Sequence, residues 1–528
     1  MGAAEVGNKA WNLMRMAAAG LPVPPGFVLP TLWCGPRHVP GTGKPAQHRI
    51  LRQGIDRLER LSGLGFGSSR RPLLVSVRSG ASVSMPGMME TVLDVGVNDE
   101  TVEGLVGLTG NPRLAWDCYR RLLQGYAEIV QGLSPEPFNE LTRAALAVEG
   151  IENEDMLDHR ALQHLVQAML SRFRDLAGMP FPQSAADQLE QATDAVFRSW
   201  DAPKATEYRR LNQISDRIGT AVTVQTMVFG NAGGTSGAGV GFTRDPATGD
   251  DALYVDFQFN GQGEDVVAGR LALTDANRLR STLPSAWDRL KEIRRQLETM
   301  FTDVQDFEFT IQNGRLYLLQ TRDAKRTPWA ALKIACDLVE EGLIQPKQAL
   351  HRLSAINLAK VVRSHLAGSH NMPVARATVA GIGVVSGRIA LDDQAAKQFA
   401  DKGDPAILVR RETTTADILG MANAAGILTS RGGRTSHAAV VARQLGKVCL
   451  VGCAALSIDP DRRICHIALG EFAEGDWLTL DGDSGAVYSG RLEVTLERPD
   501  AGLATIARWR ATEPATLVNS GPGGHAAS

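Results

Sequence analysis

The segment that decides the fold of the C-terminal half is Gly426-Ile-Leu-Thr-Ser-Arg-Gly-Gly-Arg-Thr-Ser-His-Ala-Ala-Val-Val-Ala-Arg443. Its first residues, 426–430, form an apolar run typical of a buried strand, and a helix is predicted to begin around His437. A strand that passes through a short loop into a helix is the repeating step of α/β domains. Short strands and helices alternate from about 374 to 490, so we expect a compact α/β domain there.

The loop of this segment places an imidazole at the N-terminus of a helix. Thr435 and Ser436 are candidates for the helix cap, with Arg431 and Arg434 beside them. The positive field at this position disfavours the imidazolium form, so we expect His437 to be neutral and nucleophilic. The same field would stabilise a phosphoryl group on the ring. A lone histidine is more often a cap or core residue, but these features together favour a nucleophile.

A second segment, 229–249, contains seven glycines in a loop between two predicted strands. Without side chains, its backbone N–H groups could approach a polyphosphate closely, and the hydroxyls of Thr235 and Ser236 would add donors. The loop has neither the Gly-Lys-Ser/Thr of a Walker loop nor a GxGxxG that opens a helix. The alternative is a flexible surface hairpin.

Polar side chains recur on two predicted strands joined by Asn313-Gly314, a strong hairpin signal. Asp306 and Glu308 are two residues apart on the first strand, so they share a face, and Gln320 and Arg322 do so on the second. Asp306, Glu308 and Gln320 would suit Mg²⁺ that bridges phosphate oxygens, with Arg322 neutralising charge. The alternative is the solvated face of an ordinary strand.

Several basic residues lie in apolar or glycine-rich surroundings. Lys9 follows Val-Gly-Asn, and Arg78 follows a predicted buried strand at a Ser/Gly loop, where arginines that clamp phosphate are often found. Arg120 and Arg121 lie on an amphipathic helix predicted over 113–133. Each of these alone could serve solubility only.

Composition excludes several classes of protein. The 56 basic and 58 acidic residues of the 528-residue chain give a net charge of −2, which argues against nucleic-acid and membrane-surface binding. The chain shows no membrane-spanning run and no secretion signal, and its six cysteines are scattered, so we expect a cytoplasmic protein. Cys449, Cys453 and Cys465, with His466, are interpreted as strand core rather than zinc ligands.

Together these segments resemble the pyruvate, phosphate dikinase family over roughly residues 5–490. The resemblance rests on Lys9, at the lysine of the family's Gly-Gly-Lys-Gly motif, and on the stretches 21–27, 77–81, 84–93, 119–121, 242–249, 261–267, 319–322 and 432–442. Asn8 and Ala10 replace glycines beside the lysine, and Glu90 replaces a typical Asp. The Met-Pro-Gly-Met-Met stretch at 85–89 is more similar to the phosphate-using dikinase than to the water-using phosphoenolpyruvate synthase.

The resemblance implies a multidomain α/β and α+β protein, with an ATP-grasp nucleotide-binding domain that carries a helical insertion, followed by a swivelling α/β phosphohistidine domain. The implied boundaries are an N-terminal ATP-grasp subdomain at 1–99, a helical subdomain at 100–200, a C-terminal ATP-grasp subdomain at 201–326, a helical linker at 327–373, the phosphohistidine domain at 374–490 and a partly disordered tail at 491–528.

The resemblance also implies an ATP-dependent phosphotransferase that uses inorganic phosphate and Mg²⁺. His437 would be phosphorylated, with Arg78 and Arg322 assisting, to give AMP and pyrophosphate. The residues implied to hold ATP, phosphate and Mg²⁺ are Lys9, Arg78, Arg121, Thr235, Ser236, Asp306, Glu308, Gln320 and Arg322. Thr435 matches a position that plant members use for regulatory phosphorylation.

The phosphoryl acceptor stays open at this point. The family's pyruvate-binding barrel needs about 250 residues, whereas 38 follow residue 490, so we expect pyruvate or another acceptor to bind a separate barrel or domain. One alternative is transfer to a different small molecule, as in the related rifampicin phosphotransferase and glutamine kinase groups. The other is a non-catalytic ATP-binding regulatory module.

Overall fold

The computed structural model describes residues 1–34, 44–83, 85, 88–267, 276–367, 372–414, 417–433 and 436–512. The chain divides into two compact units. The first comprises Met1–Ala238, Phe259–Gln262 and Glu308–Arg322, and the second comprises Gly239–Gln258, Gly263–Phe307 and Asp323–Ser528. Helices and sheets occur in both units, so the fold is a mixed α/β, multidomain one.

The first unit is built on an antiparallel sheet with the strand order β1-β6-β4-β5. Its strands are β1 (Gly26–Leu29), β4 (Val75–Gly80), β5 (Thr91–Val95) and β6 (Ala221–Thr226), and a short parallel pair, β2 (Gly65–Phe66) and β3 (Pro72–Leu73), precedes β4. Alternate valines of β4 and β6 are buried, as expected for β-branched residues in a central strand. Arg78 lies opposite Thr91 on one side and Thr223 on the other.

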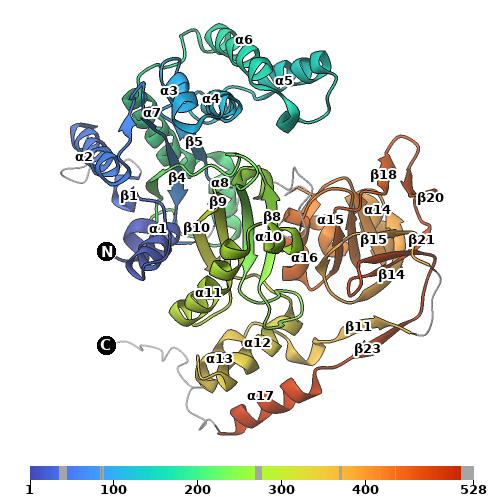
Figure 1. Ribbon diagram of the computed structural model, residues 1–528. Helices are drawn as coiled ribbons and strands as arrows, with labels where there is room; N and C mark the ends of the chain where they lie inside the picture. The colour runs from blue at the N-terminus through green and yellow to red at the C-terminus, as the bar shows by residue number, and fades with distance from the viewer. Residues whose placement is uncertain are drawn as a thin grey trace, which may run out of the picture. The chain divides into compact units, whose positions relative to one another are not determined.

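Helices pack around this sheet and complete the core of the first unit. Helices α4 and α7 pack directly on β5, and α6 packs on α4 (Figure 1). The rings of Tyr126 and Phe173 lie 5.1 and 5.5 Å from that of Phe181 within this core. The helices of the unit are α1 (Ala3–Ala18), α2 (Lys44–Ser62), α3 (Thr101–Thr109), α4 (Pro112–Ile129), α5 (Glu136–Glu149), α6 (His159–Ala177), α7 (Ala185–Arg198) and α8 (Pro203–Leu211), with 3₁₀ turns at Thr31–Trp33, Glu154–Met156 and Ser199–Asp201.

A second four-stranded sheet has the order β10-β9-β7-β8. Its strands are β7 (Gly237–Phe242), β8 (Tyr254–Phe259), β9 (Gln305–Gln312) and β10 (Arg315–Asp323), and the helices between β8 and β9 are α9 (Gly263–Val267), α10 (Ala276–Thr282) and α11 (Pro284–Phe301). Asn313 and Gly314 both have positive φ, 51° and 78°, which confirms the predicted two-residue hairpin.

The predicted α/β domain contains an eight-stranded sheet with the order β12-β22-β21-β14-β15-β16-β17-β13. Strands β14 to β17 are parallel neighbours, and antiparallel strands flank them. The strands are β12 (Ala375–Arg376), β13 (Thr378–Gly381), β14 (Val384–Ala390), β15 (Ala406–Arg410), β16 (Gly426–Thr429), β17 (Val448–Val451), β21 (Trp477–Asp481) and β22 (Ala486–Ser489), with the separate sheet β18 (Leu456–Asp459), β19 (Ile464–Ile467) and β20 (Gly470–Ala473) and the helices α14 (Asp393–Asp401), α15 (Ile418–Asn423) and α16 (His437–Leu445).

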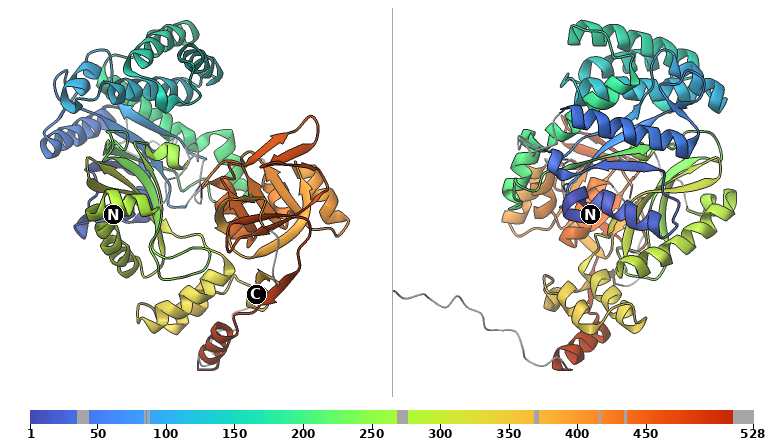
Figure 2. Two further views of the ribbon diagram at one scale, coloured as in Figure 1. Left: turned by 45° about the vertical axis from the view of Figure 1, so that its right-hand side comes forward. Right: turned by 90° about the vertical axis from the view of Figure 1, so that its left-hand side faces the viewer.

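The segment after residue 490, which was expected to be a partly disordered tail, contains regular structure. Residues Val494–Glu497 form β23, which pairs with β11 (Arg363–Leu366), and Asp500–Thr512 form α17. Helix α17 buries Ile506. It packs against α12 (Pro328–Glu340) and α13 (Pro346–Arg352), and its red ribbon lies next to their yellow ribbons in both views of Figure 2. A 3₁₀ turn at Leu358–Lys360 precedes β11. Part of the expected disordered tail is therefore structured, because it has partners elsewhere in the chain.

At the N-terminus, the sequence predicts a short helix over Ala10–Ala19 that ends at Gly20. The observed helix α1 begins at Ala3, so Lys9 lies inside a helix. Gly7 interrupts this helix with φ of 77°. The sequence also predicts helices at roughly 158–178, 184–200, 328–343 and 346–353, and the structure confirms them with small shifts at their ends.

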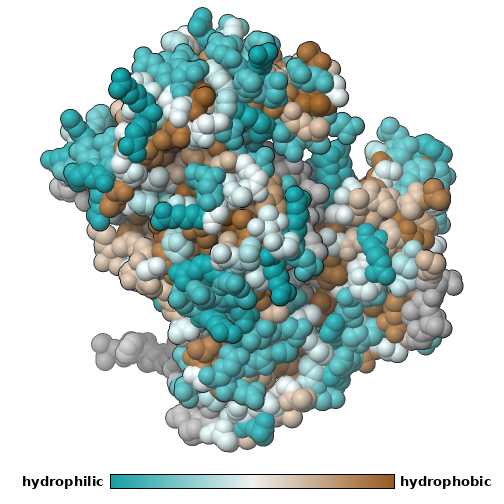
Figure 3. Space-filling model, in the orientation of Figure 1, coloured by the Kyte–Doolittle hydropathy of each residue, from teal (hydrophilic) through white to brown (hydrophobic). Residues whose placement is uncertain are grey.

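The visible surface in Figure 3 is hydrophilic over most of its area, with apolar residues in small groups. Within the described ranges, none of the helices combines the length and the apolar character that crossing a bilayer requires.

Candidate functional site

In the first unit, the charges of two arginines and one carboxylate act on the Lys9 ammonium. Lys9 comes from α1, Arg78 from β4 and Arg322 from β10, and the charges of Arg78, Arg322 and Glu308 all act on the Lys9 ammonium. Burial, followed by the repulsion from Arg78, lowers the pKa of Lys9 to about 8, although Glu308 opposes the shift. An excess of positive charge in a partly desolvated place is an arrangement that suits a polyanion.

Gly7 explains why α1 carries Lys9 to β4. A Cβ on Gly7 would collide with the Gly80 carbonyl, so only glycine allows the helix to approach the end of β4 this closely. The Asn8 N–H donates to the Ala81 carbonyl at 3.0 Å. A Cβ atom built on Gly80 would lie 3.7 Å from the Cβ of Lys9. The helix kink therefore sets Lys9 beside the strand that bears Arg78.

Glu308 and Gln320 lie together across the β9–β10 hairpin. The Gln320 Nε2 donates to the Glu308 Oε1 at 3.2 Å. Glu308 is partly exposed, whereas residues 305–307 and 309–311 around it are buried. If these polar residues formed the solvated face of an ordinary strand, every second residue would be exposed. The burial pattern of β9 does not support that alternative. Asp306, two residues before Glu308, is only 4% exposed.

The oxygen donors of these strands fit a divalent cation. Mg²⁺ is held in proteins by one or two carboxylates together with substrate phosphates and waters, rather than by a cage of protein ligands. Asp306 and Glu308 carry carboxylates on β9, and Gln320 carries an amide oxygen on the neighbouring strand β10. The donor set thus fits a cation that shares its shell with phosphate.

The glycine-rich loop is held by its neighbours more firmly than the sequence indicated. Ser236 is fully buried, and its hydroxyl accepts from the Asn313 N–H at 2.9 Å. The Gly314 N–H donates to the Thr235 carbonyl at 2.9 Å, while the Thr235 side chain is exposed. These bonds fasten the loop to the β9–β10 turn. The phosphate contacts of Thr235 and Ser236 stay predictions, with Thr235 exposed and Ser236 buried.

Arg121 lies on α4 and is held by a buried carboxylate that sequence reasoning missed. Its Nε donates to the Asp117 Oδ2 at 2.9 Å. Arg120, considered with it from the sequence, is only 4% exposed and also binds Asp117. The sequence does contain a signal for these ion pairs, because an aspartate three and four residues before two arginines lies on the same face of a helix.

The His437 segment has the predicted strand–loop–helix form, with β16 ending at Thr429 and α16 beginning at His437. Ser436 occupies the N-cap position, but its hydroxyl is buried and makes no hydrogen bond, so the expected side-chain cap is not formed. Gly432 has φ of 101°. Arg434, Thr435 and the His437 side chain lie outside the described part of the chain.

Arg443, on the same helix, was not singled out from the sequence. It is only 2% exposed, and its guanidinium carbon lies 5.3 Å from the centre of the Phe242 ring. Burial lowers the pKa of Arg443. The sequence signal for a buried arginine of this kind is a single arginine near the end of a helix face that is otherwise apolar.

The cysteines near this helix belong to the core. Cys449, Cys453 and Cys465 are buried and unoxidised, and burial raises the pKa of Cys449 to about 12 and that of Cys465 to about 11. Cys449 and Cys465 lie in β17 and β19, which confirms their interpretation as strand-core residues.

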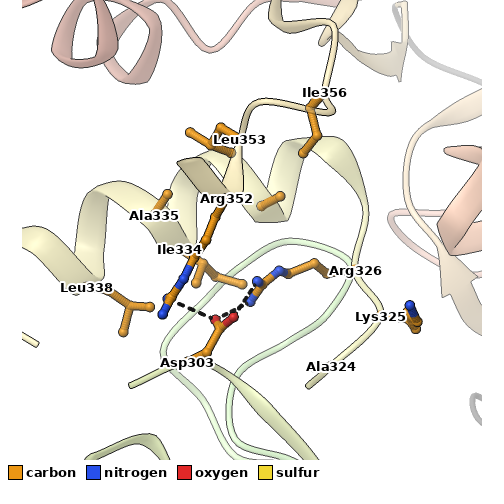
Figure 4. Close-up of a pocket in the computed structure, with 11 residues that line it drawn as sticks. Asp303, Ala324, Lys325, Arg326, Ile334, Ala335, Leu338, Arg352, Leu353 and Ile356 are labelled. Carbon is orange, nitrogen blue, oxygen red and sulfur yellow. Dashed lines mark hydrogen bonds and ion pairs between the residues drawn. The ribbon is translucent and has the colours of Figure 1, made fainter. Parts of the chain in front are cut away.

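One cavity of the second unit lies apart from these residues. It has a volume of about 200 Å³ and combines the apolar side chains of Ile334, Leu338 and Leu353 with an ion cluster (Figure 4). The Asp303 carboxylate accepts from Arg326 at 2.7 and 2.9 Å and lies 3.5 Å from Arg352. The cluster joins the start of β9 to α13 and is satisfied internally.

Comparison with known proteins gives two domain matches. The family model of the pyruvate phosphate dikinase AMP/ATP-binding domain matches residues 48–283, and that of the mobile domain of PEP-utilising enzymes matches residues 402–485. The first contains the glycine-rich loop and Arg121, and the second contains His437.

Individual relatives agree with these matches. The chain is 42% identical over 511 residues to pyruvate, phosphate dikinase of Clostridium symbiosum and 41% identical over 524 residues to that of Rhizobium meliloti, and each match covers 96% of this chain and 58% of the relative. Pyruvate, phosphate dikinase 2 of Zea mays is 40% identical over 508 residues, covering 96% of this chain and 57% of the relative. The chain spans less than two thirds of these relatives' length, and nearly all of the chain is matched, so it is similar to part of each of these pyruvate, phosphate dikinases.

Proposed function

We propose that this chain uses ATP and inorganic phosphate to phosphorylate His437. The observation that carries the proposal is the group formed by Lys9, Arg78, Arg322 and Glu308, whose excess positive charge suits the triphosphate of ATP. The family relationship supports ATP as the ligand. We also propose that the chain is divided into domains at the boundaries that the family resemblance implies.

In the proposed reaction, the neutral His437 imidazole attacks the β-phosphorus of ATP and AMP leaves. Inorganic phosphate then attacks the terminal phosphorus of the pyrophosphoryl group on the histidine. Pyrophosphate departs, and the phosphoryl group from the β-position of ATP stays on the ring. No electron transfer is involved, and each displacement forms one P–N or P–O bond while one P–O bond breaks.

The chain's own residues have separate tasks in this scheme. Lys9, Arg78 and Arg322 orient the phosphates and neutralise charge that develops on their oxygens. Arg121 and Thr235 would bind ATP from α4 and the glycine-rich loop. Asp306, Glu308 and Gln320 would hold Mg²⁺, which supplies further charge neutralisation on the phosphates when bound.

The phosphoryl group would then pass to pyruvate or to another acceptor on a separate domain or chain. The relatives are named for pyruvate and phosphate, which supports pyruvate as the first acceptor to test.

Position-specific labelling tests the proposal. With Mg²⁺ and phosphate, β-³²P-ATP should give acid-labile, base-stable label on the protein, whereas γ-³²P-ATP should give labelled pyrophosphate and no retained label. His437→Asn should bind ATP but remain unlabelled. Retention of γ-label would instead indicate an ordinary kinase step, and ATP binding without any label would leave a regulatory module.

Acceptors can be tested on the isolated phosphoprotein. Pyruvate should remove the label only when an acceptor domain is added, such as the portion of a relative that this chain does not match. Loss of label to another small molecule, without that addition, would establish the alternative phosphotransferase.

A further inference from the structure

Asp117 is a buried carboxylate that joins three partners from two parts of the first unit. It lies on α4 and is 4% exposed. Its Oδ1 accepts from the Arg120 Nε and Nη2 at 3.1 and 2.9 Å. Its Oδ2 accepts from the Arg121 Nε at 2.9 Å and from the Asn231 Nδ2 at 3.3 Å. One carboxylate thus binds the proposed ATP-binding arginine and the start of the glycine-rich loop.

The connection continues beyond Asn231. The Asn231 Oδ1 accepts from the Gln262 Nε2 at 2.9 Å, and the Gln262 Oε1 accepts from the Gly230 N–H at 3.4 Å. A Cβ on Gly230 would collide with the Gly261 carbonyl, so the two backbone segments are in close contact. Asn231 and Gln262 are each 4% exposed. A continuous chain of buried hydrogen bonds therefore links α4 to the loop.

The electrostatics of Asp117 favour its charged form. Burial alone would raise the pKa of Asp117, but the Arg121 and Arg120 guanidiniums hold it well below its usual range. Hydrogen bonds that a charged carboxylate accepts are stronger than those between neutral groups. Loss of the Asp117 carboxylate would also leave its buried donors without an acceptor.

We propose that Asp117 is a positioning residue for nucleotide binding, which holds the Arg121 side chain and, through Asn231 and Gln262, the glycine-rich loop in one fixed arrangement. The part of this proposal that concerns ATP rests on the function proposed above. The effect of Asp117 on the glycine-rich loop is independent of that function. Asp117 need not touch the nucleotide, because its influence passes through groups that it binds.

The chain offers a matched control in Asp303. Like Asp117, it is buried and bound by two arginines, but it lies in the second unit and joins β9 to α13 (Figure 4). Asp117→Asn and Asp303→Asn therefore remove the same kind of charge from the same kind of cluster. Only the first change should affect the loop and nucleotide binding.

The first measurement is amide hydrogen exchange in the ligand-free full chain. In Asp117→Asn, peptides covering residues 230–236 should exchange about tenfold faster than in the wild type, because the loop loses a charged anchor. Asp303→Asn should leave these peptides unchanged. Asn231→Ala, which spares both arginine pairs, should also speed exchange in the loop and covers the case in which Asp117→Asn folds poorly.

The second measurement is the dissociation constant for MgATP by calorimetry, together with the rate of His437 labelling at saturating ATP. Asp117→Asn should weaken binding about tenfold while the saturated rate changes less than threefold. Unchanged loop exchange in both Asp117→Asn and Asn231→Ala would overturn the positioning role. Faster exchange with unchanged ATP affinity would overturn its link to nucleotide binding, and a wild-type protein that binds ATP without labelling His437 would refute the proposed function alone.

Discussion

At the scale of single residues, the proposed role of Lys9 in ATP binding can be tested through the ionisation of its amine. Its pKa is lowered from 10.5 to about 8 in the folded protein, so the free ammonium loses its proton as pH rises through about 8. We expect the dissociation constant of ATP to increase above pH 8, because the uncharged amine no longer attracts phosphate. Calorimetry across pH 7–10 measures this change, and proton uptake on binding should be largest in the upper part of that range.

Lys9→Arg is the control for this pH dependence, since guanidinium stays charged throughout the range. Its ATP affinity should vary less between pH 8 and 10 than that of the wild type. An identical rise in both proteins would assign the titration to another group.

The same lowered pKa has a stability consequence with a definite sign. Protonated Lys9 is disfavoured in the folded state, so its destabilising effect is complete below pH 8 and is relieved between pH 8 and 10.5. Relative to Lys9→Met, the ligand-free wild type should therefore gain stability over that window. Its denaturation midpoints in urea at pH 7.5 and 9.5 measure this difference.

At the scale of elements, the kink of α1 is the feature most sensitive to a single methyl group. Gly7→Ala would combine φ of 77° with a collision at the Gly80 carbonyl. We expect a loss of about 2 kcal/mol or more in the free energy of unfolding, and weaker ATP binding because Lys9 is displaced. Urea denaturation and calorimetry measure the two effects.

Gly107→Ala in α3 is the matched change. Its built Cβ meets no atom within 4 Å and its φ lies outside the left-handed region, so it should preserve ATP affinity and stabilise the helix slightly. A Gly7→Ala protein as stable as Gly107→Ala would contradict the account of the α1–β4 contact.

Local patterns predicted those elements whose signals lie within a few residues. Asn313-Gly314 defined its hairpin, and the loop before His437 was placed between a strand and a helix, because turn and periodicity signals are local. The start of α1 was missed since a glycine within a helix is ordinarily unfavourable, and only contact with Gly80 explains it. The burial of Ser236 and the Asp117–Asn231 bond were equally hidden, because they join segments distant in sequence.

At the scale of the whole molecule, each of the two units contains hydrophobic core clusters. One core surrounds Tyr126 and Phe173 in the first unit, and others line both faces of the eight-stranded sheet in the second. Scanning calorimetry should therefore give a calorimetric enthalpy larger than the van't Hoff enthalpy. MgATP should raise the transition of the first unit more than that of the second. A single two-state transition would show that the units unfold as one.

The pairing of β11 with β23 has a consequence for how this chain could be rebuilt. The Ala367 N–H donates to the Glu493 carbonyl at 3.1 Å, so the polypeptide enters and leaves the intervening stretch at neighbouring points. Residues 368–492 are thus an insertion whose two ends meet, and α17 returns the chain to the helices from which it departed. We expect that this stretch can be exchanged between relatives as one segment, joined next to the hydrogen-bonded residues Ala367 and Glu493. The flanking helices should then begin and end at the same residues as before.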